Sequence, residues 1–98
     1  MDIEFEWDEN KRRTNIRKHG FDFEGAAEVF EGETVTTEDT RYEYGETRFL
    51  TFGMWKGRVV VIAHTESEHS IRIISLRKAT KHEEKQYFQA LGYELGAD

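Results

Sequence analysis

The chain has 98 residues, of which 37% are hydrophobic and 35% are charged, and its formal net charge is −6. This length predicts a single domain over residues 1–98 with a modest core, and thirteen aromatic residues (seven Phe, four Tyr and two Trp) exclude a disordered chain, because disordered segments are poor in aromatics. The absence of cysteine excludes disulfides and thiolate metal sites, and the lack of a long apolar run or a basic-then-apolar start leads us to expect a cytoplasmic protein without a signal peptide or membrane span.

The first segment of the chain predicts a strand followed by a helix. Apolar and acidic side chains alternate from Ile3 to Trp7, which is the period of a half-buried strand. Asp8 is a suitable N-cap for a helix that Gly20 ends, and cations near the end of this helix complement its dipole. Ile16 is its one aliphatic residue, so we expect the helix to pack lightly and to expose most of its cationic surface.

The middle of the chain predicts a short helix and then strands. Residues 22–32 place apolar side chains at helical spacing. A weak strand over residues 34–37 leads into an acidic loop, and an alternating strand follows from Thr47 to Trp55. Lys56-Gly57 supplies a tight turn into residues 58–65, whose run of β-branched residues predicts the central strand.

The last third of the chain predicts one more strand and a final helix. Residues 66–68 form a hairpin before a strand that begins at Ile71. Thr80 with Glu83 three residues later is a capping box, so a helix begins here, with an apolar stripe that includes Tyr87. The resulting order, β-α-α-β-β-β-α, predicts an α+β domain with a largely antiparallel sheet and helices on one face.

Charged residues are segregated along the chain. Residues 11–19 contain five cations and no acid, residues 21–46 contain nine acids and one cation, and residues 70–85 contain five cations and two acids. Such a pattern predicts separate basic and acidic faces on one small domain. The alternative is that each segment is a solvated face neutralised by its neighbour in three dimensions.

The strand from Ile71 to Ala79 carries Arg72 and Arg77 among apolar residues. Arginine is rarely buried without a partner, so two guanidinium groups here indicate either an anion site or ion pairs with some of the many carboxylates. The two arginines are five residues apart, so a regular strand points them to opposite faces. A bulge, or a strand that ends before Arg77, is needed to bring them together.

Several short pieces occur in a characteristic order over nearly the whole chain. They are Phe5-Glu6-Trp7-Asp8 with Lys11 and Asn15, Lys18-His19-Gly20 with Phe23 and Ala26, Glu46 with Arg48, Arg72-Ile73-Ile74-Ser75 with Arg77-Lys78-Ala79, and Glu83 with Tyr87. This ordered set resembles the BrnT family, the toxins of type II toxin-antitoxin pairs. The resemblance implies a RelE-like fold and a ribonuclease that arrests growth by cleaving RNA. It also implies a BrnA-like antitoxin partner, which forms a hetero-oligomer with the toxin and supplies any contact with DNA.

The residues themselves are compatible with metal-independent RNA cleavage. Such an enzyme needs one group to take the proton of a ribose 2′-hydroxyl, another to protonate the leaving 5′-oxygen, and cations for the charge that develops on the phosphate oxygens. Arginine suits the third task because its planar fork holds two phosphate oxygens and stays charged. We expect Arg48, Arg72 and Arg77 to do this from adjacent strands or strand ends.

His19 is the first candidate for proton transfer, because histidine titrates near neutral pH. Its position also suits a histidine that merely complements the dipole at a helix C-terminus. Glu46 is a second candidate base, or it orients the arginine two residues later. Tyr87 either donates a hydrogen bond to RNA or packs under the sheet, and Trp55 either stacks on a base or contacts the antitoxin.

We expect RNA contacts from cations of the first helix, the last strand and the last helix, and from the two aromatic residues above. The candidates are Lys11, Arg12, Lys18, Trp55, Lys78, Lys81 and Tyr87. A metal site is the alternative chemistry, and its ligands would come from His64, His69 and His82 with Glu66, Glu68 and Glu83. No two of these histidines have the i, i+4 spacing of a zinc protease motif, so we expect neither a metal nor a cofactor.

The acidic total keeps a second function open. An efficient RNA binder is expected to be basic, so the alternative is a non-catalytic interaction module that retains the fold and the antitoxin-binding groove. Inhibition of a protein target such as gyrase, as in ParE-type relatives, is a third possibility that the residues do not separate from the first two.

Overall fold

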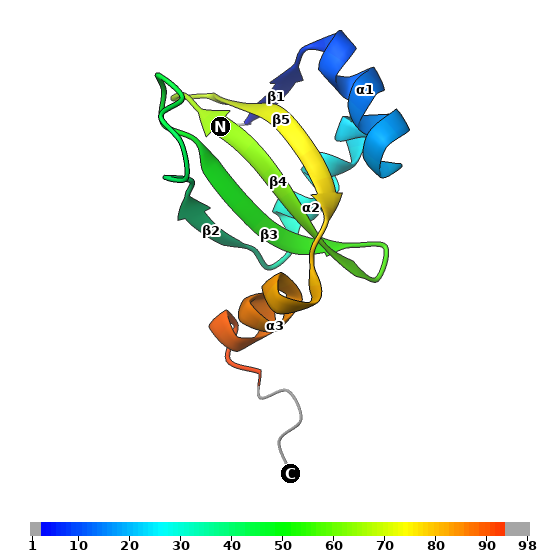
Figure 1. Cartoon of the computed structure of the whole chain (residues 1–98), viewed down its shortest axis with the longest axis vertical. Helices are drawn as coiled ribbons and strands as arrows, with labels where there is room; N and C mark the ends of the chain where they lie inside the picture. The colour runs from blue at the N-terminus through cyan, green and yellow to red at the C-terminus, as the bar shows by residue number, and fades with distance from the viewer. Residues whose placement is uncertain (1–2, 94–98) are drawn as a thin grey trace.

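The computed structural model of the chain describes residues 3–93, which form a five-stranded sheet with helices packed on both faces (Figure 1). The strands are β1 (Glu4–Trp7), β2 (Val35–Glu38), β3 (Phe49–Trp55), β4 (Arg58–Glu66) and β5 (Ser70–Lys78), and the helices are α1 (Glu9–His19), the 3-10 helix η1 (Phe23–Gly25), α2 (Ala26–Glu31) and α3 (Lys81–Ala90). The order across the sheet is β1-β5-β4-β3-β2, so β4 is central as predicted. Only the pairing of β1 with β5 is parallel, which confirms the predicted α+β fold with a largely antiparallel sheet.

Two features of the predicted architecture are wrong. The weak strand is a true member of the sheet, since β2 pairs with β3 along its whole length, and the order is therefore β-α-α-β-β-β-β-α. The helices also lie on both faces of the sheet and not on one. Val35 of β2 and Phe52 of β3 stand opposite each other and pack with Tyr87 of α3, so burial against α3 explains why a threonine-rich segment joins the sheet.

The core is divided by the sheet into two clusters. One face, here called the α2 face, packs against η1 and α2, and its fully buried side chains include Phe23, Val29, Ile62 and Leu76. The other, here called the α3 face, packs against α3. Its cluster is smaller and contains Val59, Val61, Ala79 and Tyr87.

The local signals predicted for the helix ends and the turn are confirmed. Asp8 accepts hydrogen bonds from the first backbone N–H groups of α1, and Gly20 ends this helix at a φ of 78°. Thr80 and Glu83 form both bonds of the capping box at the start of α3. The Lys56-Gly57 turn takes φ values of 49° and 79°, as a two-residue hairpin turn of this kind requires.

A bulge in β5 solves the geometric problem of the two arginines. Ala63 of β4 stands opposite Ser75 and His64 stands opposite Ile73, so Ile74 is the extra residue of β5. Ile73 and Leu76 consequently both enter the core of the α2 face although they are three residues apart. The neighbouring Arg72 and Arg77 therefore both belong to the α3 face.

The buried side chain of Asn15 replaces a missing strand. β1 pairs with β5 only as far as Ile73, so the next part of β5 has a free edge. Asn15 Nδ2 donates to the carbonyl of Leu76 at 2.8 Å, and Asn15 Oδ1 accepts from the backbone N–H of Leu76 at 3.1 Å. Nδ2 also donates to the carbonyl of Phe21 at 3.0 Å. The amide thus satisfies the β5 backbone as a neighbouring strand would, and it anchors α1, whose Ile16 is 37% exposed.

We predict that Asn15→Ala destabilises the domain by about 3 kcal/mol, because it leaves buried backbone groups of Leu76 and Phe21 without partners. Chemical denaturation gives the free energy of unfolding for both proteins. Asn10→Ala is the matched control, since Asn10 is exposed on the same helix. An Asn15→Ala variant within about 0.5 kcal/mol of this control would contradict the role given to the amide.

Candidate functional site

The centre of the candidate site is an ion pair between Arg77, at the end of β5, and Glu83, in the first turn of α3. Arg77 Nη1 and Nη2 donate to the two carboxylate oxygens at 2.8 and 2.9 Å. The capping box holds Glu83 in place, because the N–H of Thr80 also donates to its carboxylate. The hydrogen bonds from Arg77 lower the pKa of Glu83 to about 2. The sequence predicted either an anion site or an ion pair for Arg77, and in this structure Arg77 forms the ion pair.

The half-buried His19, the last residue of α1, lies near this pair. Burial lowers its pKa, and the positive charges of Lys18 and Arg77 lower it further. Asn15, one helical turn before His19, is hydrogen-bonded to the backbone of Leu76, the residue before Arg77, so the end of α1 and the end of β5 meet in this region. Because its pKa is lowered, the imidazole is neutral near pH 7, which is the form that can accept a proton.

The loop between β2 and β3 contributes one charge, that of Arg41, to the electrostatics of Arg77. The pKa of Arg77 is raised by its hydrogen bonds to Glu83, and the charge of Arg41 acts against this rise. Arg41 itself is held by Asp39, whose two carboxylate oxygens accept from Nε at 2.8 Å and Nη2 at 2.9 Å. Sequence reasoning missed Arg41 as a site residue. The available signal was that Arg41 is the one cation among the nine acids of residues 21–46.

Arg48 and Glu46 form a separate pair at the start of β3. Arg48 Nε lies 3.6 Å from Glu46 Oε2, and the guanidinium lies 3.9 Å from the centroid of the Tyr44 ring. Nε is buried and has no hydrogen-bond partner within residues 3–93. This arrangement suits the alternative in which Glu46 orients Arg48.

Arg72 is exposed on the α3 face, away from the ion pair at the end of its strand. It stands opposite Thr65 of β4 and Glu6 of β1 in the sheet register. Because of the bulge, Arg72 lies on the same face of the sheet as Arg77. The two arginines therefore belong to one surface that extends along β5.

The predicted RNA-contacting residues fall into two groups. The exposed ones are Lys11, Lys18, Lys78 and Lys81. Arg12, Trp55 and Tyr87 serve the fold instead. Arg12 binds Asp22 through two hydrogen bonds, Trp55 packs edge-on against Phe21 at 5.5 Å, and Tyr87 is 2% exposed with its hydroxyl donating to the carbonyl of Glu33.

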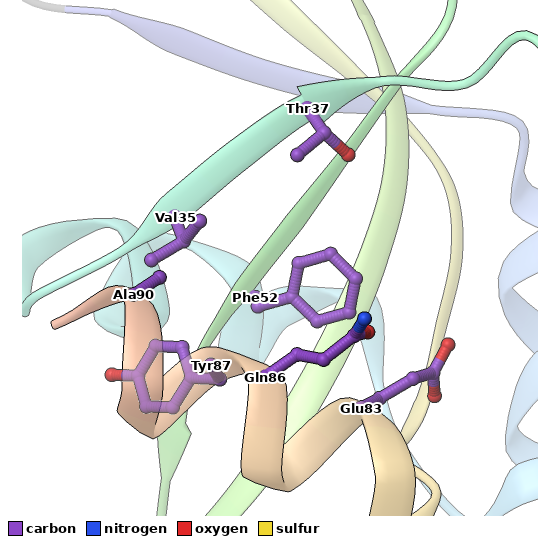
Figure 2. Close-up of a pocket in the computed structure, with 7 residues that line it drawn as sticks. All are labelled: Val35, Thr37, Phe52, Glu83, Gln86, Tyr87 and Ala90. Atoms are coloured by element: carbon purple, nitrogen blue, oxygen red, sulfur yellow. The ribbon is translucent and has the colours of Figure 1, made fainter. Parts of the chain in front are cut away.

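A groove runs between α3 and the strands β2 and β3, as Figure 2 shows. Its volume is about 270 Å³, and it is lined by Val35, Thr37, Phe52, Glu83, Gln86, Tyr87 and Ala90. Most of these side chains are apolar or aromatic. Glu83 closes the end of the groove beside Arg77, so an occupant of the groove would lie next to the ion pair.

The three histidines considered as metal ligands do not form a cluster. His64 is fully buried on the α2 face, where its ring stacks on Phe49 and its Nε2 lies 2.7 Å from the hydroxyl of Thr51. His69 is exposed in the β4–β5 turn, and His82 is exposed near the start of α3. Within residues 3–93, no three His, Asp or Glu side chains come together as a metal-ligand set. The helices in this range are also too short or too polar to cross a membrane.

Comparisons with known proteins agree with the resemblance seen in the sequence. The family model described as "Ribonuclease toxin, BrnT, of type II toxin-antitoxin system" matches residues 7–83. The structure is similar to the crystal structure of the Brucella abortus ribonuclease toxin, BrnT, with a TM-score of 0.62 and 27% sequence identity. That match covers 81% of this chain and 99% of the Brucella chain. A comparison with curated proteins finds no match.

We predict that acid destabilises the domain through His64 before the carboxylates protonate. Burial lowers the pKa of His64 from 6.5 to about 4. Between these two values the unfolded chain binds a proton that the folded chain does not. Stability is therefore complete above pH 6.5 and falls by about 3 kcal/mol as the pH drops to 4. The partly exposed carboxylate of Glu66, 3.5 Å from Nδ1, is too hydrated to offset the burial of the ring.

The measurement is the free energy of unfolding at several pH values between 7.5 and 4 for the wild type and for His64→Gln. The variant retains His19, whose pKa burial also lowers, so the difference between the two curves isolates His64. Parallel curves for the two proteins would show that His64 is not the group responsible.

Proposed function

Because the chain belongs to the BrnT family of ribonuclease toxins of type II toxin-antitoxin systems, we propose that it is a metal-independent endoribonuclease that cleaves cytoplasmic RNA and arrests growth. We also propose that the fold is RelE-like. The observation that carries the proposed activity is the contact of α1 with the end of β5, where Asn15 binds the backbone of Leu76. This contact brings His19, whose pKa burial lowers, and Arg77 to one region, and together they supply a proton acceptor and a phosphate ligand.

His19 acts as the general base in this proposal. Its neutral imidazole takes the proton of a ribose 2′-hydroxyl, and the 2′-oxygen attacks the adjacent phosphorus to form a 2′,3′-cyclic phosphate. The bond from phosphorus to the 5′-oxygen breaks, and the leaving 5′-oxygen takes a proton from solvent water. Arg77 stabilises the charge that develops on the phosphate oxygens. Lys18, beside His19 and exposed, is placed to bind a neighbouring phosphate.

The ion pair with Glu83 is compatible with this role of Arg77. Glu83 uses Nη1 and Nη2, and Nη1 also donates to the carbonyl of Lys78 at 3.3 Å. None of the hydrogen bonds within residues 3–93 uses Nε of Arg77. The edge of the guanidinium formed by Nε and Nη2 is therefore available to hold two oxygens of a phosphate, while Glu83 fixes the plane of the group.

The remaining cations extend this centre into an RNA surface. Arg72 continues the α3 face along β5, and Lys78 and Lys81 flank the ion pair at the junction of β5 with α3. Lys11 lies two helical turns before Lys18 on α1, which prolongs the cationic surface away from the sheet. We assign to Arg48 and Glu46 a supporting role at the loop that precedes β3.

We assign the groove beside α3 to a BrnA-like antitoxin. The groove is lined mainly by apolar side chains and ends at the Arg77–Glu83 pair, so a partner segment seated there would cover the catalytic arginine. DNA contact by the complex would come from the antitoxin.

The second candidate function is a non-catalytic module that keeps the fold and the groove. The observation in its favour is the bidentate Arg77–Glu83 pair, which would be purely structural in such a protein. Incubation with total RNA, with and without EDTA, separates the two. Cleavage that survives EDTA supports the ribonuclease, and the absence of cleavage supports the module.

We predict that Arg77→Ala lowers the rate of RNA cleavage by about a hundredfold or more, because one preorganised donor to a developing oxyanion is lost. The loss of a partly exposed ion pair costs about 1 kcal/mol, so the melting temperature falls by only about 4 to 8 °C. Arg77→Lys should restore little activity, since lysine lacks the planar fork. Arg58→Ala, which removes another exposed arginine, is the control.

Arg72→Ala separates catalysis from folding more cleanly, because Arg72 is exposed on the α3 face. We expect slower cleavage with an unchanged melting temperature. Cleavage and thermal unfolding are measured on the same preparations. If both arginine variants cleave RNA at the wild-type rate, the phosphate-binding role is excluded.

We predict that Ala90→Glu disrupts the complex with the antitoxin and leaves RNA cleavage unchanged. Ala90 lines the groove and is exposed, so a carboxylate there blocks an apolar segment without strain in the toxin. Gln89→Glu adds the same charge at the neighbouring position, which does not line the groove, and is the matched control. Co-purification with the product of the adjacent reading frame is the readout. If Ala90→Glu still co-purifies with the antitoxin, the antitoxin binds a surface other than this groove.

A further inference from the structure

The loop between β2 and β3 encloses a second hollow, with a volume of about 490 Å³. Two tyrosines and an arginine contribute to its lining, namely Tyr42, Tyr44 and Arg48, together with the carboxylates of Glu43 and Glu46. A hollow of this size falls in the range of small-molecule pockets. Its combination of aromatic rings, a guanidinium and hydrogen-bond acceptors is the chemistry that binds a planar heterocycle.

The loop is held in one conformation by the buried carboxylate of Asp39. This side chain is 2% exposed and accepts hydrogen bonds from the backbone N–H and the guanidinium of Arg41 and from the hydroxyl of Tyr44. Its own backbone N–H donates to the carbonyl of Arg48, so the two ends of the loop are tied together. A surface loop with this many internal bonds is preorganised for a ligand.

Tyr42 is the most exposed large hydrophobic side chain of this loop. It is 70% exposed, and its ring meets that of Tyr44 edge to face at a centroid distance of 5.9 Å. Arg48 covers Tyr44 at 3.9 Å. Tyr44 is thus fixed by Asp39 and Arg48, and it supports Tyr42 in turn, whose outer surface is free for stacking.

We propose that this hollow binds an unpaired nucleobase of the RNA substrate, stacked on Tyr42. The inference rests on the proposed function and adds a base-binding subsite to it. Single-stranded RNA is recognised mainly by stacking of splayed bases on aromatic side chains and by hydrogen bonds to their edges. Stacking needs no positive charge, so it suits an acidic loop on which phosphate binding would be weak.

The carboxylates of the hollow favour a base that carries an amino group. Glu43 and Glu46 offer acceptor oxygens, and adenine, cytosine and guanine present N–H₂ donors that uracil lacks. The subsite should therefore bind these three bases more tightly than uracil.

Binding of 2′-O-methyl oligonucleotides tests the proposal, because they cannot be cleaved through the 2′-oxygen. At fixed salt, Tyr42→Ala should raise the Kd of oligoadenylate by about tenfold or more, as expected for the loss of one base–aromatic stack. Tyr42→Phe keeps the ring and should restore binding. Tyr93→Ala is the matched control, since Tyr93 is 53% exposed just beyond α3.

The outcomes distinguish this inference from the proposed function. If wild-type protein cleaves RNA and Tyr42→Ala binds oligoadenylate as well as the wild type does, the subsite is excluded while the ribonuclease stands. If Tyr42→Ala binds RNA normally but loses the antitoxin, Tyr42 contacts protein and the inference is overturned. If the wild type neither binds nor cleaves RNA, the proposed function itself fails. Equal affinity for oligouridylate and oligoadenylate would overturn the assigned base preference.

Discussion

The pairing of Asn15 with the backbone of Leu76 is the interaction on which the rest of this structure depends. β1 ends at Trp7 and the chain turns into α1, so the last part of β5 pairs with β4 on one edge and has no strand of residues 3–93 on the other. The Asn15 amide fills this place and anchors α1 to β5. His19 follows one helical turn later and Arg77 follows Leu76 directly, so one buried hydrogen-bonded contact sets the distance between the base and the phosphate ligand of the proposed reaction.

The end of β5 joins the fold and the site in a second way. Glu83 caps α3 and fixes the plane of the Arg77 guanidinium, so the start of the helix and the orientation of the arginine depend on one carboxylate. The groove beside α3 ends at the same carboxylate. A partner bound in the groove would therefore act on the site through contact with Glu83, without any change in the sheet.

The distribution of charge matters more here than the net charge of −6. Exposed lysines belong to α1 and to the junction between β5 and α3, whereas many acids belong to the segment that contains α2, β2 and the following loop. Several of these acids are already paired, as Asp22 is with Arg12 and Asp39 is with Arg41. Neutralisation within the fold thus accounts for these acids, and the interpretation of a separate basic face belongs to the proposed RNA surface.

The sequence by itself determined the features that depend on neighbours in the chain. These are the caps of α1 and α3, the Lys56-Gly57 turn and the alternation of β3, because a cap or a two-residue turn is built within a few residues. Only the tertiary structure decided the placement of α3 on its own face, the bulge at Ile74 and the contact of Asn15 with Leu76, which lie 61 residues apart. The last of these rests on one polar side chain that meets a distant backbone, and neither periodicity nor composition carries a signal for such an encounter.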